Sequence, residues 1–262
     1  MNISASTLYY RRSHPRRVRY SSQERDAVLG MFRFHLGSFG RRVLHNELAK
    51  ADVHISEHRI SRILKDAGVR SKYGRKKCRN VHTNKETAEK YIAENLYRAL
   101  GAAAKSMDVW SMDFTEEKIE GRKVITCGIV SVNGKQLIAR VSDCRNSKEA
   151  ALETLRQGLE RFGKPDMVMS DRGSPFVSKA FHDELEMLGI RHSMSRAHTP
   201  VDNCFIETFW KSMKTEIGKV RQLSVERYLQ IMEYYEYYYN YLRPHSALAY
   251  RPPLPRPCST VI

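Results

Sequence analysis

The sequence predicts an all-α domain followed by a larger mixed α/β domain. Three short amphipathic helices are expected between residues 21 and 69, each with one apolar stripe. Further along the chain, three β-rich segments follow one another, and helices then alternate with strands. That order indicates a mixed sheet covered by helices. The chain has 262 residues, of which 41% are hydrophobic, which is enough to build a core in each domain.

The three N-terminal helices are predicted from capping residues and apolar spacing. Ser21 and Glu24 form a capping-box pattern that begins the first helix. A second helix is expected over residues 41–50, and Ser56 can cap a third helix that Gly68 ends. A tight turn between the second and third helices is typical of a helix-turn-helix unit. The apolar residues expected to face their common core are Val28, Phe32, Leu36, Leu44, Leu48, Ile60, Ile63, Leu64 and Ala67.

The chain is strongly basic. Lys and Arg number 45 against 29 Asp and Glu, which gives a formal net charge of +16. Such an excess can serve solubility alone, but the clustering of the charges favours a polyanionic partner, and nucleic acid is the best candidate.

Basic residues cluster on the outer face of the third predicted helix and in the segment that follows it. The helix face could also be an ordinary solvated surface, and the pattern alone leaves that alternative open. Residues 70–79 have little apolar content and are typical of a charged linker that could follow a phosphate backbone. The cationic residues expected to contact nucleic acid in these clusters are Arg59, Arg62, Lys65, Arg75, Lys76 and Lys77.

The second domain is predicted element by element from changes in periodicity. A connecting helix is expected from Thr83 to about Lys105. The expected strands cover residues 109–115, 124–132, 136–141, 167–170 and 190–194, with a hairpin turn at Asn133–Gly134. The expected helices cover residues 147–162, 179–188 and 203–217.

No export or membrane segment is recognisable. The first residues hold no apolar run of signal-peptide length, and the later apolar runs are too short to span a bilayer. The 5 cysteines lie far apart without a Cys-x-x-Cys pair, which argues against a disulfide framework or a structural zinc site. We therefore expect a cytoplasmic protein without a membrane partner.

Three carboxylates occupy positions from which they can meet at one edge of the sheet. Asp113 lies at the end of the first predicted strand, and Asp171 directly follows the fourth. If these strands are neighbours, the two side chains lie side by side, which is costly unless a cation lies between them. Glu207 follows on a helix, with 35 residues between it and Asp171. Any one of these acids could be a surface charge, so the prediction rests on all three together.

The helix that carries Glu207 is expected to have two distinct faces. Trp210, Lys211 and Lys214 follow Glu207 at helical spacing and share its face. Oxygen ligands from three elements suit Mg²⁺, and two such ions can support an in-line displacement at a phosphodiester. We therefore expect the three carboxylates to be both metal-binding and catalytic. The residues expected to form the buried stripe of this helix are Phe205, Ile206, Phe209, Met213 and Ile217.

A further predicted helix contains six tyrosines between residues 234 and 241. Base stacking is one interpretation, and core packing with the hydroxyl groups at the rim is the favoured one. Arg243 and His245 could pair with phosphate or with the core, and the sequence leaves both open.

From about Gly37 to Pro253 the sequence resembles a known family. The motifs that carry the likeness are Phe39-Gly40-Arg41-Arg42, Trp110-Ser111-Met112-Asp113, Ser170-Asp171-Arg172-Gly173-Ser174-Pro175-Phe176, Ser193-Met194-Ser195, Asp202-Asn203, Glu207-Thr208-Phe209-Trp210-Lys211 and Tyr239-Asn240-Tyr241-Leu242-Arg243-Pro244-His245-Ser246-Ala247-Leu248. They resemble the retroviral-integrase-like transposases of bacterial insertion sequences, which usually have a Lys or Arg seven residues past the glutamate, here Lys214. The likeness is closest to the group encoded by two overlapping reading frames, whose downstream frame supplies the catalytic part. Residues 197–200 and Cys204 depart from the family pattern, which affects expected local DNA contacts and no carboxylate.

The resemblance implies a ribonuclease H-like core that depends on Mg²⁺ or Mn²⁺, with two ions expected. It implies binding to transposon ends and target DNA, cleavage that exposes a 3′-hydroxyl, and strand transfer, which together constitute DNA integration and recombination. To the expected DNA contacts we add Arg41, Arg42, Lys211 and Lys214. The location implied is bacterial, cytoplasmic and nucleoid-associated.

A homo-oligomer is expected on DNA, because two transposon ends must be held together. No apolar heptad pattern long enough for a coiled coil is present, so fusion to, or help from, an upstream-frame product is also expected.

The expected organisation is a basic segment (1–20), a helix-turn-helix domain (21–69), a basic linker with connecting helix (70–105), the catalytic core (106–220) and a tyrosine-rich helix and tail (221–262). Two alternatives stay open. A non-catalytic DNA-binding regulator of transposition would show no metal-dependent cleavage, and a nuclease on the same fold would leave free ends without joined strands.

Overall fold

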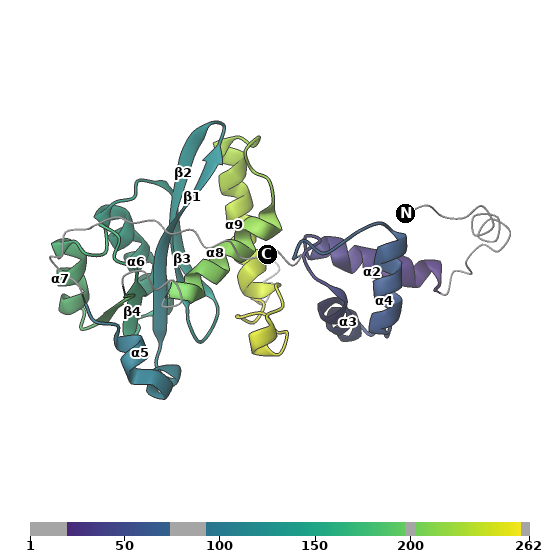
Figure 1. Ribbon diagram of the computed structural model, residues 1–262, viewed down its shortest axis with the longest axis horizontal. Coiled ribbons are helices and arrows are strands. Elements are labelled where there is room, and N and C mark those ends of the chain that lie inside the picture. Colours follow the sequence, from purple (N-terminus) through teal and green to yellow (C-terminus); the bar gives the residue numbers. More distant parts are fainter. Residues whose placement is uncertain (1–19, 74–92, 197–202, 258–262) are drawn as a thin grey trace, which may run out of the picture. The chain divides into compact units, whose positions relative to one another are not determined.

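The computed structural model describes residues 20–73, 93–196 and 203–257 (Figure 1). The chain divides into two compact units, residues 1–75 and 76–262. The expected DNA contacts Arg75, Lys76 and Lys77, and the expected helix up to residue 92, lie outside the described residues. None of the helices in the described ranges is long and apolar enough to cross a membrane.

The described part of the first unit contains three helices, α2 (Ser22–Phe34), α3 (Arg41–Lys50) and α4 (Glu57–Asp66). The capping box is confirmed: the Ser21 hydroxyl accepts from the Glu24 N–H at 3.0 Å, and the Glu24 carboxylate accepts from the Ser21 N–H at 2.7 Å. The local sequence therefore fixes where α2 begins.

Apolar residues from all three helices form one core in the first unit. Because helices of this length are marginal by themselves, the packing of their stripes stabilises them. The expectation that Leu36 continues the stripe of α2 is wrong, since α2 ends at Phe34 and Leu36 has a left-handed φ of 56°. The buried members are Val28, Leu29, Phe32, Leu44, Leu48, Ile55, Ile60, Ile63 and Leu64.

The second unit is built around a five-stranded sheet with the order β3-β2-β1-β4-β5. The strands β1, β2 and β3 pair antiparallel, whereas β4 pairs parallel with β1 and β5 parallel with β4. Each of the expected strands is present, and the mixed sheet has the ribonuclease H-like strand order. The strands are β1 (Val109–Ile119), β2 (Arg122–Ser131), β3 (Leu137–Cys144), β4 (Met167–Ser170) and β5 (Arg191–Met194).

Helices cover both faces of the sheet (Figure 1). On one face lie α6 (Lys148–Phe162), against β2 and β3, and α7 (Lys179–Met187), against β5. On the other face α8 (Cys204–Ile217) packs on β1 and β2, and α9 (Val225–Tyr241) packs on β3 and α8. The chain continues past α9 into the short 3-10 helix η3 (Ser246–Leu248).

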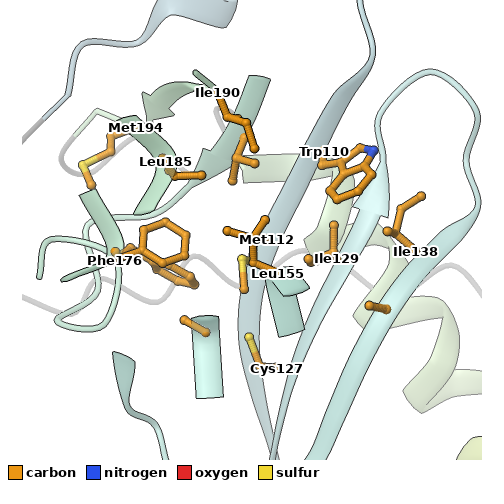
Figure 2. Packing of buried hydrophobic residues seen from close by; sticks show 14 residues of the cluster. Trp110, Met112, Cys127, Ile129, Ile138, Leu155, Phe176, Leu185, Ile190 and Met194 are labelled. Atoms are coloured by element: carbon orange, nitrogen blue, oxygen red, sulfur yellow. The ribbon is translucent and has the colours of Figure 1, made fainter. Parts of the chain in front are cut away.

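The main core lies on the α6 and α7 face of the sheet. Figure 2 shows Trp110 and Met112 of β1 beside Cys127 and Ile129 of β2 in this core. These residues alternate along their strands with side chains of the opposite face, as the pleat of a strand requires. The opposite face is therefore free to carry different chemistry.

The segment before β1 differs from its prediction. Instead of one helix continuing to Lys105, the described part has a short helix α5 (Leu96–Leu100) followed by a 3-10 helix, η1 (Gly101–Ser106). Gly101 has a φ of 51°, which an α-helix does not accommodate. The prediction of a continuous helix is therefore wrong at its C-terminal end.

Candidate active site

The strands β1 and β4 bring Asp113 and Asp171 to corresponding positions of the sheet. Their parallel register pairs Ser111 with Met169, and the same offset two residues further places Asp113 opposite Asp171. Because side chains alternate along a strand, both aspartates lie on the α8 face. The expectation that Asp113 ends its strand is wrong, because β1 continues to Ile119 and remains paired with β2.

A buried hydrogen bond fixes the start of α8 relative to β1. The Ser111 hydroxyl donates to Oδ1 of Asn203, the N-cap residue of α8, at 3.2 Å. Ser111 precedes Asp113 by two residues on the same strand face, and Glu207 follows Asn203 by four residues on the same helix face. The bond therefore brings Glu207 toward Asp113. The Asp202-Asn203 motif marked this position in the sequence without indicating its partner.

The three carboxylates influence one another electrostatically. Burial raises the pKa of Asp113 to about 7, and the negative charges of Asp171 and Glu207 contribute to that rise. Burial also raises the pKa of Asp171, and burial together with the charge of Asp171 raises the pKa of Glu207. Each group thus favours its neutral form, because poorly hydrated like charges repel. A cation placed among them would remove this cost.

The loop after β4 holds Asp171 through backbone contacts. The Asp171 Oδ1 accepts from the Gly173 N–H at 2.8 Å, and a Cβ on Gly173 would come within 2.9 Å of that oxygen. The Ser195 N–H donates to the Ser170 carbonyl at 2.9 Å, and the Arg172 Nε donates to the Ser195 carbonyl at 3.0 Å. These bonds between the segments of Ser170 and Ser195 therefore hold the loop that carries Asp171 in place.

The donor chemistry of this site fits a hard divalent cation. Its three side chains offer carboxylate oxygens alone, and their mutual repulsion is of the kind that Mg²⁺ or Mn²⁺ relieves. In the described part of the chain, no group of three or more His, Cys, Asp or Glu side chains is gathered closely enough to hold a metal ion. The fit is therefore one of donor chemistry, since the exposed Glu207 side chain is not gathered with the two aspartates in this arrangement.

The buried face of α8 differs from its prediction at one important residue. Trp210, which was expected beside Glu207 on the open face, is 5% exposed. The buried side chains of this helix are Ile206, Phe209, Trp210, Met213 and Glu216. Phe205 and Ile217, both expected in the stripe, are partly buried. Helical spacing alone therefore identified Ile206, Phe209 and Met213 but assigned Trp210 to the wrong face.

The two lysines of α8 have different surroundings. Lys214 Nζ donates to the Glu116 carbonyl at 2.9 Å and lies 3.1 Å from the Glu117 carboxylate. Lys211 is exposed, and no ion pair joins it to another described residue. Lys214 therefore links α8 to the extended end of β1, while Lys211 projects into solvent one turn beyond Glu207.

The end of α8 is tied to α9 by a buried ion pair. Arg243 Nη2 and Nε donate to the Glu216 carboxylate at 2.7 and 2.9 Å, and the Tyr235 hydroxyl donates to it at 2.9 Å. His245 is 8% exposed and packs edge-on against Tyr239. The choice left open between phosphate and core is thus settled for Arg243 and His245, which belong to the core.

The favoured core role for the tyrosines of α9 is confirmed for part of them. Tyr235, Tyr238 and Tyr239 are buried, whereas Tyr234 and Tyr237 are 53% and 43% exposed. Helical geometry separates the two groups onto different sides of α9.

The basic residues of the first unit form exposed ion pairs within it. Arg59 lies 2.5 Å from Glu24, and Arg41 and Arg42 lie 3.1 and 4.0 Å from Glu57. Exposed pairs of this kind contribute about 0–1 kcal/mol, so a stronger anion can displace them. Arg62 is partly buried, and Lys65 is exposed on α4.

Comparison with known proteins assigns the second unit to a family. Two models of the integrase core domain match residues 103–200 and 188–253. The chain is 25% identical over 236 residues to the transposase for insertion sequence element IS904 of Lactococcus lactis, over 87% of this chain and 90% of that protein. It is 27% identical over 215 residues to an uncharacterized 31 kDa protein of insertion element IS600 of Shigella sonnei, over 80% and 78%.

Among solved structures, the catalytic core domain of HTLV-2 integrase in complex with magnesium is similar over 55% of this chain and 92% of its own, at 16% identity and a TM-score of 0.44. The assignment rests on the matches in sequence. The chain belongs to the integrase-core family, in the group that includes the transposases of bacterial insertion sequences.

Proposed function

We propose that this chain is a transposase that cuts DNA at the ends of an insertion sequence and joins the exposed 3′ ends to target DNA. The observation that supports the proposal is the strand register, whose continuation brings Asp113 opposite Asp171 on the face where α8 carries Glu207. The transposase of IS904 among the relatives supports the same reaction class.

The three carboxylates are proposed as the ligands of two divalent ions, Mg²⁺ or Mn²⁺. Such ions, when bound, activate the attacking oxygen and stabilise the leaving oxygen of an in-line displacement. The chain positions the three ligands. Asp113 lies on a central strand, Asp171 lies in a loop held by hydrogen bonds, and the Ser111–Asn203 bond fixes the start of the helix that carries Glu207. Lys211 is placed to bind a DNA phosphate, because its ammonium group faces solvent beyond Glu207.

Lys214 is proposed as a second DNA contact, provided that a DNA phosphate displaces its present partners on β1. Its side chain is 38% exposed and its ammonium is held by the end of β1, so phosphate must compete with Glu117 for it. Its role therefore combines positioning of α8 with a contact to DNA near the cleaved bond.

The three-helix unit is proposed to bind duplex DNA through α4. Arg59, Arg62 and Lys65 lie on its solvent side, and Arg41 and Arg42 begin α3. Arg75, Lys76 and Lys77, which lie outside the described residues, are proposed as further phosphate contacts, and the affinity of such contacts falls as salt rises. At least two copies of the chain are proposed to assemble on DNA, with the help of an upstream-frame product, since two ends are cut.

The test is cleavage and joining of a labelled transposon-end duplex by the full chain, with and without Mg²⁺. Asp171→Asn and Glu207→Gln should each lower both steps roughly a hundred- to a thousandfold, the scale of removing a group that stabilises developing charge. Asp166→Asn is the matched control, because Asp166 precedes the same strand at its other end and should leave the rate near that of the wild type.

The products separate the proposed function from its alternatives. DNA binding without metal-dependent cleavage by the wild type would indicate a regulator, and cleaved ends without joined strands would indicate a nuclease. Substantial joining by either carboxamide variant would overturn the assignment of the site.

A further inference from the structure

The indole N–H of Trp210 is buried without a hydrogen-bond acceptor. Among the described residues, three buried side-chain nitrogens make no hydrogen bond: His35 Nε2, Arg140 Nε and Trp210 Nε1. The first two lie 3.6 and 3.1 Å from glutamate carboxylates, so they have an ionic partner. An indole nitrogen is only a donor, and a buried donor that stays unpaired lowers stability. The Trp210 N–H therefore has no aligned acceptor in the present arrangement of side chains.

Gly128 of β2 creates the space in which the Trp210 ring lies. A Cβ on Gly128 would come within 2.7 Å of Cη2 and 2.8 Å of Cζ2 of the indole. The ring therefore rests directly on the backbone of β2, where any other residue would place its side chain. Glycine weakens the interior of a strand, and its presence there is typical of such a close approach.

The antiparallel register places this ring beside Asp113. Gly128 is the direct cross-strand partner of Asp113, and directly opposed residues project their side chains to the same face, roughly 4.5–5.5 Å apart. Trp210 thus fills the position next to the Asp113 carboxylate. Its Nε1 adjoins the same edge of the ring as Cζ2, so the free donor lies on the side of the indole that approaches β2.

The side chain of Trp210 is also one of the groups that interact with the Asp113 carboxylate. The two groups are thus adjacent but not aligned as a hydrogen bond. A rotation of the Asp113 side chain could complete the bond.

We propose that Trp210 is a positioning residue whose indole N–H donates to one carboxylate oxygen of Asp113 and directs the other oxygen toward a divalent ion. This inference rests on the proposed function and adds a residue to its site. The alternative is that Trp210 only fills space between α8 and β2. Removing the partner that orients a metal ligand typically weakens metal binding about 10–100-fold, whereas loss of filling volume lowers stability alone.

The chain provides a matched control in its other tryptophan. Trp110 is fully buried in the core on the opposite face of the sheet, and its side chain interacts with Asp108 rather than with Asp113. Trp110→Phe and Trp210→Phe therefore remove the same atoms, including an N–H beside an aspartate. Only the second change touches the carboxylate site.

The experiment measures Mn²⁺ binding to the full-length chain by electron paramagnetic resonance of the free ion. Trp210→Phe should weaken binding roughly 10–100-fold, while Trp110→Phe should bind as the wild type does. Gly128→Ala should weaken binding too, because it displaces the ring while keeping the N–H. In the joining assay, Trp210→Phe should need more Mn²⁺ for half-maximal rate and should recover the wild-type rate at saturation.

The outcomes separate this inference from the proposed function. If Asp113→Asn abolishes Mn²⁺ binding while Trp210→Phe and Gly128→Ala bind as the wild type, the site stands and the role of Trp210 is overturned. If the wild type binds no Mn²⁺, both are overturned. A loss of maximal rate that high Mn²⁺ does not restore would assign Trp210 a merely structural role. Should Trp210→Phe fail to fold, Gly128→Ala decides the question.

Discussion

Two pairs of aspartates lie at the two ends of the paired segment of strands β1 and β4, each in the register of that pairing. The pairs differ in what compensates their negative charge. Asp108 and Asp166 precede the two strands, and Asp113 and Asp171 lie beyond the segment over which they pair. At the first end the Asp108 N–H donates to the exposed Asp166 carboxylate at 2.8 Å, and the Asp166 N–H donates to the Asp108 carbonyl at 2.9 Å. Both aspartates are exposed, and backbone groups bond to this pair.

At the second end the aspartates are partly buried, and a third acid joins them. Burial and the charges of its neighbours raise the pKa of Asp113 to about 7, while the pKa of Asp108 is raised chiefly by burial. Each pair of aspartates lies beside a tryptophan. The first pair makes structural hydrogen bonds, whereas the carboxylates of the second pair repel each other. Unsatisfied charge, rather than residue type, distinguishes the candidate site.

The largest stability effect should come from breaking the deeply buried charge pair between Arg243 and Glu216 at the end of α8. Arg243→Ala leaves Glu216, which is 1% exposed, without its cation. The free energy of unfolding should fall by about 3–5 kcal/mol in chemical denaturation. Arg122→Ala, which breaks an exposed pair with Asp143, is the control and should cost less than about 1 kcal/mol. Equal losses of stability in the two variants would show that burial does not determine how much a charge pair stabilises this protein.

A smaller effect on stability should follow from His245, a buried side chain that the fold keeps neutral. Burial and the charge of Arg243 lower the pKa of His245 to about 3, so the folded chain resists a proton that the unfolded chain binds below about 6.5. Stability is therefore lost as pH falls through that window. Between about pH 7.5 and 4.5, the wild type should lose roughly 2–3 kcal/mol that His245→Asn does not lose. The check is denaturation at both pH values, with exposed His58→Asn as control; parallel losses in all three proteins would contradict it.

The smallest effect on stability should accompany a clear effect on rate. Ser111→Ala removes the hydroxyl that positions Asn203, which should cost about 1 kcal/mol and slow joining about tenfold through misplacement of Glu207. Ser142→Ala removes a comparable hydroxyl contact, to Thr126, away from the site and should leave the rate unchanged. If both variants lose the same stability and both keep the wild-type rate, the bond does not position α8.

Local features of the fold could be predicted from the sequence. The caps at Ser21, Ser56 and Ser147 begin helices where expected, because a cap acts on backbone groups two or three residues away. The Asp113 and Asp171 pairing could be inferred from strand order, although Asp113 proved to lie inside a longer strand. The polar residues 116–118 hid that extension, which depends on pairing with β2 across the turn at residues 120–121.

Features that depend on distant contacts could not be predicted. The burial of Trp210 depends on the space at Gly128, 82 residues earlier in the chain, so helical spacing placed the indole on the open face. Lys214 was expected to be available to DNA, and its partners Glu116 and Glu117 lie on a strand that approaches α8 only in the folded unit. The sequence leaves such pairings undetermined because nothing local encodes them.

The most direct test of the contrast between the two aspartate pairs is thermal unfolding of Asp113→Asn and Asp108→Asn at about pH 8, in chelator and then in excess Mg²⁺. In chelator, Asp113→Asn should melt above the wild type, by roughly 2–4 °C for each kcal/mol of repulsion removed. Mg²⁺ should raise the melting temperature of the wild type and of Asp108→Asn and leave Asp113→Asn unchanged, because only the first two retain all three carboxylates. An Asp113→Asn chain that melts below the wild type in chelator and gains as much from Mg²⁺ would contradict the account.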